Sequence, residues 1–203
     1  MQKSNFIYQI LSYPFFYILS QKLMSSLSFN ESIVKKYVKK KFINILDVGC
    51  GPADILNGLD HINYYGYDIN ESYINFAKNK YKHKKPKLFC KKFSNKEIKK
   101  LPKFDIILLS GLIHHLSDKE SNQLLILCKK VLKKRGKLIT IDPVFIKNQN
   151  PIARLLVQLD RGLNVRDKYN YLKLFKKYFK NCSNKIYIQK FIPYTMFVTC
   201  CKN

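Results

Sequence analysis

The residues with the clearest chemical potential lie in the segment Ile45–Leu56, which reads ILDVGCGPADIL. A short apolar run, typical of a buried strand, leads into Asp47 and then into Gly49, Cys50 and Gly51. Glycines in such a turn allow the backbone to approach a ligand closely, and the free N–H groups at the start of the following helix can bind polar ligand atoms. The segment therefore predicts a ligand-binding loop.

A second carboxylate narrows the class of ligand. Asp68 ends the next expected strand, 19 residues after Gly49, where folds of this kind place a carboxylate that binds ribose hydroxyls. A dinucleotide site would need a third glycine at the position of Asp54, whose negative charge would face the phosphates. The pattern therefore disfavours NAD and FAD.

Two adjacent histidines, His114 and His115, follow the fourth expected strand, directly after Ser110 and Gly111. Imidazole titrates near neutral pH, so one histidine could act as a general base on an acceptor hydroxyl or amine. Alternatively, both line the pocket without transferring a proton. Adjacent histidines point in different directions, and no Cys, Asp or Glu lies nearby at ligand spacing, so we expect no metal site.

The segment Leu155–Tyr171 gathers arginine and aspartate in a chain that has only four arginines. Arg161 or Arg166 could bind a carboxylate or phosphate on an acceptor molecule. An internal Asp–Arg pair that fixes the loop explains the same residues equally well. Tyr194 lies at the expected turn between the last two strands and could border the same pocket.

Alternating strands and helices from Phe42 onward must position these residues. The expected strands are Ile43–Val48, Asn63–Asp68, Lys87–Cys90, Phe104–Ser110, Lys137–Asp142, Lys185–Phe191 and Tyr194–Cys201. Two expected helices start near Ala53 and after Asn70. A third runs from about Asp118 to Lys134, where Gly136 ends it, and a helical region occupies Pro151–Phe179. This order predicts a doubly wound α/β sheet with its ligand crevice at the carboxyl ends of the strands.

The glycine motif and the acidic end of the second strand resemble those of class I S-adenosylmethionine-dependent methyltransferases, over Phe42–Asp142. The resemblance implies a Rossmann-like sheet of mostly parallel strands with an antiparallel last strand and helices on both faces. It implies S-adenosylmethionine as cofactor and S-adenosylhomocysteine as product. Gly49 and Gly51 would then lie against the cofactor's amino-acid and ribose moieties, with Cys50 between them. Asp47 would lie near its amino group, and Asp68 would bind its ribose hydroxyls.

The chain departs from the family pattern after the third strand. Lys92 lies about where the family often has an acid that binds the adenine amino group. Adenine contacts would then come from backbone groups and from the apolar faces of Ile69 and Phe93. Alternatively, Lys92 points to solvent and only the backbone serves. Ser110 and Gly111 would lie beneath the methionine part of the cofactor.

The resemblance also suggests a division of the chain. Residues 1–41 form an N-terminal helical lid or cap, and residues 42–203 form the methyltransferase domain, in which residues 151–184 are a helical insertion on the substrate side. The aromatic stretch Phe6–Leu19 is too short and too polar to span a membrane. As a lid it would close the cofactor site. Alternatively, it could rest on an anionic membrane surface.

Composition adds a signal with two explanations. The 203 residues carry 38 Lys+Arg against 13 Asp+Glu, a net charge of +25, which suits nucleic acid or an anionic membrane. Because almost all of these basic residues are lysine, a compositional bias explains the charge as well. The six cysteines contain no C-x-x-C pair, which predicts free thiols in a reducing compartment, without zinc or disulfides, and a cytoplasmic location.

These observations together favour methyl transfer to the oxygen or nitrogen of a small-molecule acceptor by in-line displacement. Two alternatives remain open at this point: a methyltransferase directed at RNA or the ribosome, and a cofactor-binding protein without catalysis. The chain lacks an N/D-P-P-Y motif and a Pro-Cys dipeptide, which lowers the nucleic-acid alternative. The oligomeric state is left open.

Overall fold

The structure, a computed structural model, describes residues 27–39, 41–160, 162–189 and 193–202. The strands are β1 (Asn44–Val48), β2 (Asn63–Asp68), β3 (Lys87–Cys90), β4 (Phe104–Ser110), β5 (Leu132–Pro143), β6 (Asn181–Ile188) and β7 (Thr195–Lys202). The α-helices are α3 (Leu27–Lys35), α4 (Glu71–Lys80), α5 (Asn95–Ile98), α6 (Asp118–Val131), α7 (Pro151–Gln158) and α8 (Lys168–Lys176). Short 3₁₀ turns are η1 (Asp54–Gly58), η2 (Lys82–Lys84) and η3 (Ile113–His115).

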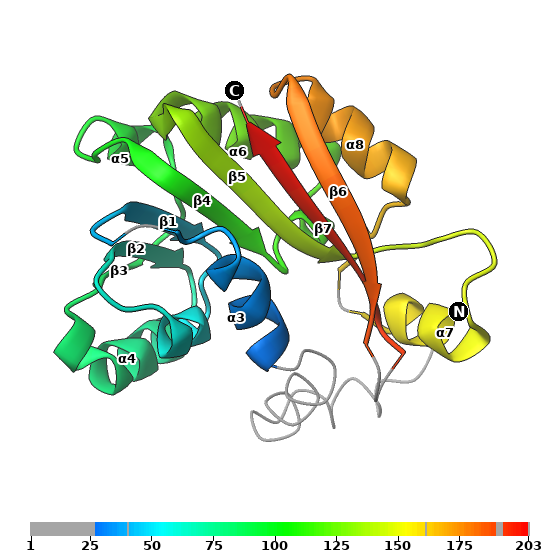
Figure 1. Ribbon diagram of the computed structural model, residues 1–203, viewed down its shortest axis with the longest axis horizontal. Helices are drawn as coiled ribbons and strands as arrows, with labels where there is room; N and C mark the ends of the chain where they lie inside the picture. The colour runs from blue at the N-terminus through cyan, green and yellow to red at the C-terminus, as the bar shows by residue number, and fades with distance from the viewer. Residues whose placement is uncertain (1–26, 40, 161, 190–192, 203) are drawn as a thin grey trace.

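The seven strands form one twisted sheet in the order β3-β2-β1-β4-β5-β7-β6 (Figure 1). The neighbours from β3 to β5 pair in parallel, and β7 runs antiparallel to both β5 and β6. Strand order reverses direction between β1 and β4, the point at which open α/β sheets bind ligands. The expected doubly wound fold with an antiparallel last strand is confirmed.

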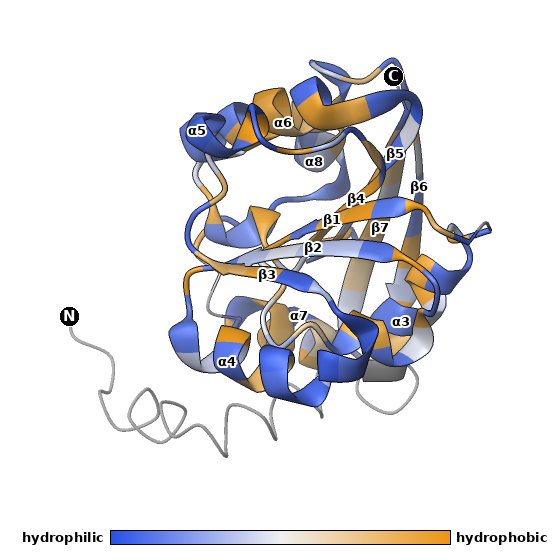
Figure 2. Cartoon of the chain, turned by 90° about the vertical axis from the view of Figure 1, so that its left-hand side faces the viewer, coloured by the Kyte–Doolittle hydropathy of each residue, from blue (hydrophilic) through white to orange (hydrophobic). Residues whose placement is uncertain are grey.

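Alternating strand residues face two helical layers, as the twofold repeat of a strand requires. Ile45 on β1 packs into the core on the side of α3 and α4, whereas its neighbour Leu46 packs on the side of α6 and α8. Figure 2 shows α5, α6 and α8 on one side of the sheet and α3, α4 and α7 on the other. Burial on both faces explains the nearly continuous apolar sequence of β4.

Local sequence signals explain how two helices next to the site begin. Asn70 caps α4 by accepting a hydrogen bond from the Tyr73 backbone N–H, as predicted. Ser117 and Glu120 form a reciprocal capping box at the start of α6. Such caps satisfy backbone donors that would otherwise lack partners, so each of these two helices starts at a defined residue.

Two expected boundaries were wrong. We expected a helix to Lys134 ended by Gly136, but α6 ends at Val131 and β5 already begins at Leu132. Leu132 is buried and pairs with Phe104 on β4. A side chain at Gly136 would lie 2.7 Å from the side chain of Leu132 and 2.9 Å from a carbonyl oxygen of β4. This glycine therefore allows close strand packing and does not end the helix.

The helical region expected at Pro151–Phe179 is divided into α7 and α8. Asn150 and Asp167 cap the two helices through their side chains. The intervening loop, described except for Arg161, carries the polar residues expected on the substrate side. The division places α7 and α8 on opposite faces of the sheet (Figure 2) and leaves between them a loop that reaches the strand ends.

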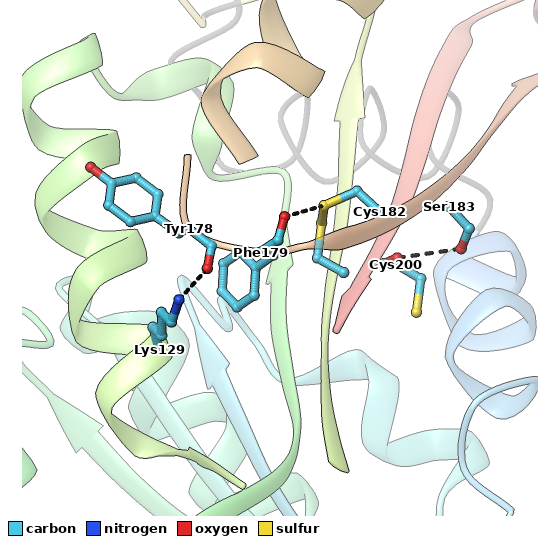
Figure 3. Close-up of a disulfide and its surroundings, with 7 residues drawn as sticks. Lys129, Tyr178, Phe179, Cys182, Ser183 and Cys200 are labelled. Atoms are coloured by element: carbon cyan, nitrogen blue, oxygen red, sulfur yellow. Dashed lines mark hydrogen bonds between the residues drawn. A yellow bond between two sulfur atoms is a disulfide. The ribbon is translucent and has the colours of Figure 1, made fainter. Parts of the chain in front are cut away.

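The expectation that the chain contains no disulfide was also wrong. Cys182 on β6 and Cys201 on β7 are direct partners in the antiparallel register and form a disulfide (Figure 3). Spacing alone could not reveal the pair, because its two members are 19 residues apart and meet only through the hairpin register. The cytoplasmic location rested partly on free thiols; it stays a prediction and loses that support.

The proposed lid lies mostly outside the described residues, which begin at Leu27. The helix expected from about Asn30 is α3, where Ile33 and Val34 are fully buried against the sheet. The aromatic stretch Phe6–Leu19 lies outside the described residues, and the division at residue 41 stays a prediction. Among the described residues, none of the helices has the length and apolar character needed to cross a bilayer.

Candidate active site

The loop after β1 has the backbone geometry that the glycine motif predicts. Gly49 and Gly51 have φ angles of +73° and +51°, a region that favours glycine. The N–H of Gly49 donates to the Tyr67 carbonyl at 2.7 Å, which holds the turn against the end of β2. A side chain at Gly49 would lie 3.0 Å from Leu112. The turn therefore combines an unusual backbone conformation with close packing.

Asp68 fixes the two loops that follow β1 and β2. One of its carboxylate oxygens accepts the N–H of Gly51 at 2.8 Å, and the other accepts the N–H of Asn70 at 2.8 Å. The carboxylate is half-buried, and each oxygen keeps a lone pair for a further donor. Ile69 beside it is 77% exposed and offers an apolar surface. Asp68 is therefore positioned to bind a diol next to a planar apolar group.

Asp47 lies buried under the glycine loop. Its Oδ2 accepts a hydrogen bond from the Tyr64 hydroxyl at 2.7 Å, and its Oδ1 has no partner in the structure. Burial, together with a smaller contribution from the charge of Asp68, outweighs the hydrogen bond from Tyr64 and raises the pKa of Asp47 to about 7. A buried carboxylate with an unsatisfied oxygen is costly unless a cation or donor pairs with it.

The remaining predicted cofactor contacts differ in how far they are exposed. Cys50 is buried, and its thiol faces the carbonyl of Gly51 at 3.7 Å. Lys92 is exposed, as the second of the two interpretations expected. Phe93 is buried with its ring edge against Tyr67 in the core of the α6 side, so it is not an exposed adenine contact here. Ile69 remains the apolar surface available beside Asp68.

The end of β4 supplies the turn that leads to the two histidines. Ser110 is half-buried at the last position of β4. Gly111 follows with a φ of +64° and donates its N–H to the Ile141 carbonyl at 2.7 Å. This turn directs η3, which carries both histidines, across the carboxyl ends of β4 and β5.

His114 lies at the centre of a buried polar network. Its Nδ1 lies 2.8 Å from an oxygen of Asp142, and its Nε2 lies 3.1 Å from an oxygen of Asp160. The same oxygen of Asp142 accepts the backbone N–H of His114 at 3.2 Å. The Tyr194 hydroxyl donates to the other oxygen of Asp160. The network joins β5, η3, the loop after α7 and the start of β7.

Two carboxylates keep the His114 imidazole charged. Burial favours the neutral ring, but the hydrogen bonds and charges of Asp142 and Asp160 outweigh it and raise the pKa of His114 to about 9. Burial opposes ionisation of Asp160, yet its contacts with His114 lower its pKa to about 2. An imidazolium with both nitrogens occupied cannot accept a proton. The geometry of His114 therefore supports the alternative that it fixes the pocket wall.

His115 is placed differently from its neighbour. It is exposed, and its ring centroid lies 4.0 Å from that of His114. Ligand atoms of His114, His115 and Asp160 lie within 4.8 Å of one another. The sequence analysis expected no acidic residue near the histidines. Asp160 lies 45 residues after His115 in the chain, and only the fold brings it close. In the structure, Asp142 and Asp160 already occupy both ring nitrogens of His114.

The predicted acceptor-binding residues also have structural partners. Tyr194 is buried, and its hydroxyl is engaged by Asp160. Arg161 lies outside the described residues. The Arg166 guanidinium contacts Asp118 at 2.7 Å and also donates to the carbonyls of Ile113, Leu116 and Asn164. An internal Asp–Arg pair therefore exists as one of the two alternatives expected, although its acid is Asp118 on α6.

The Arg166 contacts lead to a testable difference between two variants. We expect Arg166→Ala to lower the free energy of unfolding by about 2–3 kcal/mol, because three carbonyls lose a charged donor. Asp118→Ala, the matched control, removes only a carboxylate whose side chain is 82% exposed, and should cost less than about 1 kcal/mol. Urea denaturation of both variants measures the difference. Equal effects would show that the guanidinium does not hold the loop.

Sequence reasoning missed Asp142 and Tyr64. Asp142 was seen only as the end of a strand, yet it occupies the same kind of position as Asp47 and Asp68, an acid near the carboxyl end of a buried parallel strand. Three acids at such positions in a chain with only 13 acidic residues were an available signal. The hydroxyl of Tyr64 could not have been assigned, because its partner depends on strand register.

Comparison with known proteins identifies the family of the domain and other proteins with the same fold. The model of a methyltransferase domain matches residues 39–198. None of the curated proteins matches the sequence significantly. A SAM-dependent methyltransferase from Archaeoglobus fulgidus has a similar solved structure, with a TM-score of 0.68, 17% identity, and coverage of 92% of this chain and 100% of that chain.

Two further solved structures share the fold. The pyocyanin biosynthetic protein PhzM has a TM-score of 0.71 at 18% identity; the match covers 98% of this chain but only 62% of PhzM. Magnesium protoporphyrin IX methyltransferase (ChlM) from Synechocystis PCC 6803, solved with bound SAH, has a TM-score of 0.63 at 13% identity, with coverage of 100% and 90%. Since the family match spans most of the sequence, the chain belongs to the methyltransferase-domain family.

Proposed function

We propose that the protein transfers a methyl group from S-adenosylmethionine to an oxygen or nitrogen of a small-molecule acceptor. The observation that carries this proposal is the buried Asp47 carboxylate, whose Oδ1 has no partner beneath the glycine loop. The amino group of S-adenosylmethionine is a cation that would satisfy that oxygen. When bound, this cofactor supplies a methyl group that leaves its sulfonium by in-line displacement, giving S-adenosylhomocysteine.

The residues around the loop fit the rest of the cofactor. Gly49 and Gly51 carry no side chains of their own at the turn, so their backbone atoms can contact the ligand. Asp68 retains acceptor capacity for two ribose hydroxyls, and Ile69 offers an apolar surface for an adenine ring. Because Lys92 stands where the family often has an acid, backbone groups would bind the adenine amino group in this chain.

The acceptor would lie over the carboxyl ends of β4 and β5. His114 and its two carboxylates form a rigid wall there, and His115, which is exposed beside it, is the candidate general base for the acceptor. Alignment and exclusion of water are the main requirements of methyl transfer to a good nucleophile. The name of the similar protein ChlM, magnesium protoporphyrin IX methyltransferase, contains a small molecule, which supports a small-molecule acceptor here.

Calorimetric titration with S-adenosylhomocysteine tests the proposal directly. We expect Asp68→Ala to weaken binding at least tenfold, or about 1.4 kcal/mol, because ribose hydroxyls lose their charged acceptor. Asp60→Ala removes an exposed carboxylate that pairs only with Lys84 across the surface, and should leave the affinity unchanged.

Asp68 also holds Gly51 and Asn70, so the thermal unfolding of Asp68→Ala must be measured alongside its affinity. Asp68→Asn keeps one acceptor, so it should retain one of the two loop hydrogen bonds while losing much of the affinity. Absence of binding to the wild-type chain would overturn the cofactor assignment. Methylation of RNA, and of no small molecule, in cell extracts with labelled cofactor would overturn the acceptor class.

A further inference from the structure

Three side chains that can bind a metal ion meet beside the carboxyl ends of β4 and β5. His114 and His115 lie in η3 after β4, and Asp160 lies in the loop after α7. One ligand atom from each residue lies within 4.8 Å of the other two. Two imidazoles and one carboxylate are a donor set that suits Zn²⁺ and similar divalent transition metals. The cluster therefore has the number and type of ligands found in metal sites that keep one coordination position open.

The spacing of His114 and Asp160 fits a single ion. Nε2 of His114 and an oxygen of Asp160 are 3.1 Å apart. Two atoms bound to one tetrahedral zinc ion, at the usual bond lengths of about 2.0–2.1 Å, lie about 3.3 Å from each other. An ion between these two atoms would therefore need almost no movement of either side chain. The exposed ring of His115 would have to approach by at most about 1.5 Å to complete the set.

Hydrogen bonds behind these ligands hold them in the orientation that a metal ion requires. Nδ1 of His114 lies 2.8 Å from Asp142, so the proton on that nitrogen has a partner and Nε2 is the nitrogen directed at Asp160. The N–H of Gly162 donates to one oxygen of Asp160 at 2.7 Å, and the Tyr194 hydroxyl donates to the other. Partners of this kind, on the far side of a ligating imidazole or carboxylate, are typical of metal sites.

Close backbone packing holds the loop after α7 against His114. A side chain at Gly162 would overlap Cδ2 of the His114 ring and would lie 2.8 Å from the His114 carbonyl oxygen. The same carbonyl accepts the N–H of Asn164 at 2.9 Å. Cδ2 is bonded to Nε2, so the glycine lets the loop lie along the ring edge that carries this nitrogen. Asp160 is thereby held at the nitrogen that would bind the ion.

The charges around His114 favour a cation. Asp142 and Asp160 flank one imidazole, and Oδ2 of the buried Asp142 has no partner among the described residues. The cluster therefore holds more acceptor atoms than its N–H groups satisfy, which is costly in a buried position. A divalent ion would replace the Nε2 proton of His114 and release that proton to solvent. The exchange adds one positive charge, so that the ion balances both carboxylates.

We propose that His114, His115 and Asp160 bind a divalent transition-metal ion such as Zn²⁺, with a fourth coordination position open to solvent on the side of the exposed His115. Metal binding itself does not depend on the proposed function. One consequence does rest on it: the open position would take the acceptor atom, and the ion would help an acceptor hydroxyl to lose its proton. His115 would then be a ligand in the metal-bound chain and the candidate base only in the metal-free chain.

Calorimetric titration of the full chain with Zn²⁺, after treatment with EDTA and gel filtration, tests the proposal. We expect one ion per chain, with Mg²⁺ at least tenfold weaker because it prefers oxygen ligands. His115→Ala should weaken Zn²⁺ binding at least tenfold, since one of three ligands is lost. The matched control, His61→Ala with His83→Ala, removes the other two histidines of the chain. Both are exposed, and their loss should change the affinity less than twofold.

Asp160→Asn tests the carboxylate ligand. The amide keeps the size of the side chain and an oxygen that can accept a hydrogen bond from Tyr194, but it brings no charge. We expect at least a tenfold loss of Zn²⁺ affinity. Thermal unfolding of the metal-free variants shows whether each still folds, and added Zn²⁺ should raise the unfolding temperature of the wild type more than that of either variant.

Co²⁺ identifies the ligand atoms directly. Its visible absorption should show four-coordinate binding by nitrogen and oxygen, without the charge-transfer band of a thiolate such as that of the exposed Cys90. A thiolate band, absence of saturable Zn²⁺ binding, or equal losses in His115→Ala and the control would overturn the proposal. Titration with S-adenosylhomocysteine in the absence of metal tests the proposed function separately, so that either proposal can fail without the other.

Discussion

Asp142→Ala is expected to lower the free energy of unfolding by about 3–5 kcal/mol, because it leaves a buried imidazolium with one of its two carboxylates. Asp142 is 1% exposed, and one of its oxygens accepts both the ring and the backbone N–H of His114. Removing it leaves both donors unsatisfied in the core. Urea denaturation at pH 6 measures the loss.

The same network predicts how the loss depends on pH. The pKa of His114 is raised to about 9 in the folded chain, so its stabilisation is complete below the unfolded value near 6.5 and disappears as the pH rises through 9. The difference between wild type and Asp142→Ala should therefore shrink from pH 6.5 to pH 9.5. The pKa of Asp160 is lowered to about 2, so its contribution is lost only as the pH falls through 2.

Asp142→Asn is the control that keeps the shape of the side chain and removes its charge. Its amide oxygen can still accept the backbone N–H of His114, but it brings no charge. We expect a smaller loss of stability than in the alanine variant, with the same weakening of the pH dependence. A loss below 1 kcal/mol in both variants, or an unchanged pH slope, would show that the imidazolium does not depend on Asp142.

Asp47→Asn is expected to stabilise the ligand-free protein and to impair cofactor binding. The pKa of Asp47 is raised to about 7 in the folded chain, so the carboxylate costs stability progressively as the pH rises from about 4 to 7. The uncharged amide avoids this cost and can keep the hydrogen bond from Tyr64. At pH 8 the free energy of unfolding should rise by roughly 2–4 kcal/mol, and near pH 4 by little.

Binding should change in the opposite direction. Under the proposed function, ionised Asp47 would pair with the amino group of the cofactor, so wild-type affinity for S-adenosylhomocysteine should increase as the pH rises through 7. The Asp47→Asn variant should bind at least tenfold more weakly at pH 8 and lack this increase. The matched variant Tyr64→Phe removes the hydrogen bond that lowers the pKa of Asp47. In this variant the affinity for S-adenosylhomocysteine should therefore increase at a higher pH than in the wild type. Unchanged affinity in Asp47→Asn at every pH would contradict the assigned role.

The sequence predicts the fold well because local and global signals agree in it. The strand Asn63–Asp68 and the cap at Asn70 have the predicted bounds, since apolar runs and capping side chains act over a few residues. Gly136 misled the prediction, because glycine both ends helices and allows strands to pack closely, and only the neighbouring Leu132 and Phe104 distinguish the two.

The site was predictable where one loop carries it and less so where distant segments meet. The N–H of Gly51 in the loop after β1 donates to Asp68 at the end of β2, so the predicted glycine loop and the predicted carboxylate lie in contact. The Asp142–His114–Asp160 network joins residues from three segments, so its existence depends on tertiary packing. The same reason explains the disulfide, and it explains why Arg166 pairs with Asp118 instead of an acid in its own loop.

The buried carboxylate of Asp47, whose Oδ1 has no partner among the described residues, lies inside a chain with a net charge of +25. The long-range field of such a chain repels cations and attracts anions, and salt screens it over about 10 Å at 0.1 M. S-adenosylmethionine carries one positive charge more than the product that remains after transfer. Under the proposed function, the field therefore opposes entry of the cofactor more than it opposes rebinding of the product. Raising the ionic strength should therefore weaken this difference between cofactor entry and product rebinding, while the buried contact with Asp47 changes little.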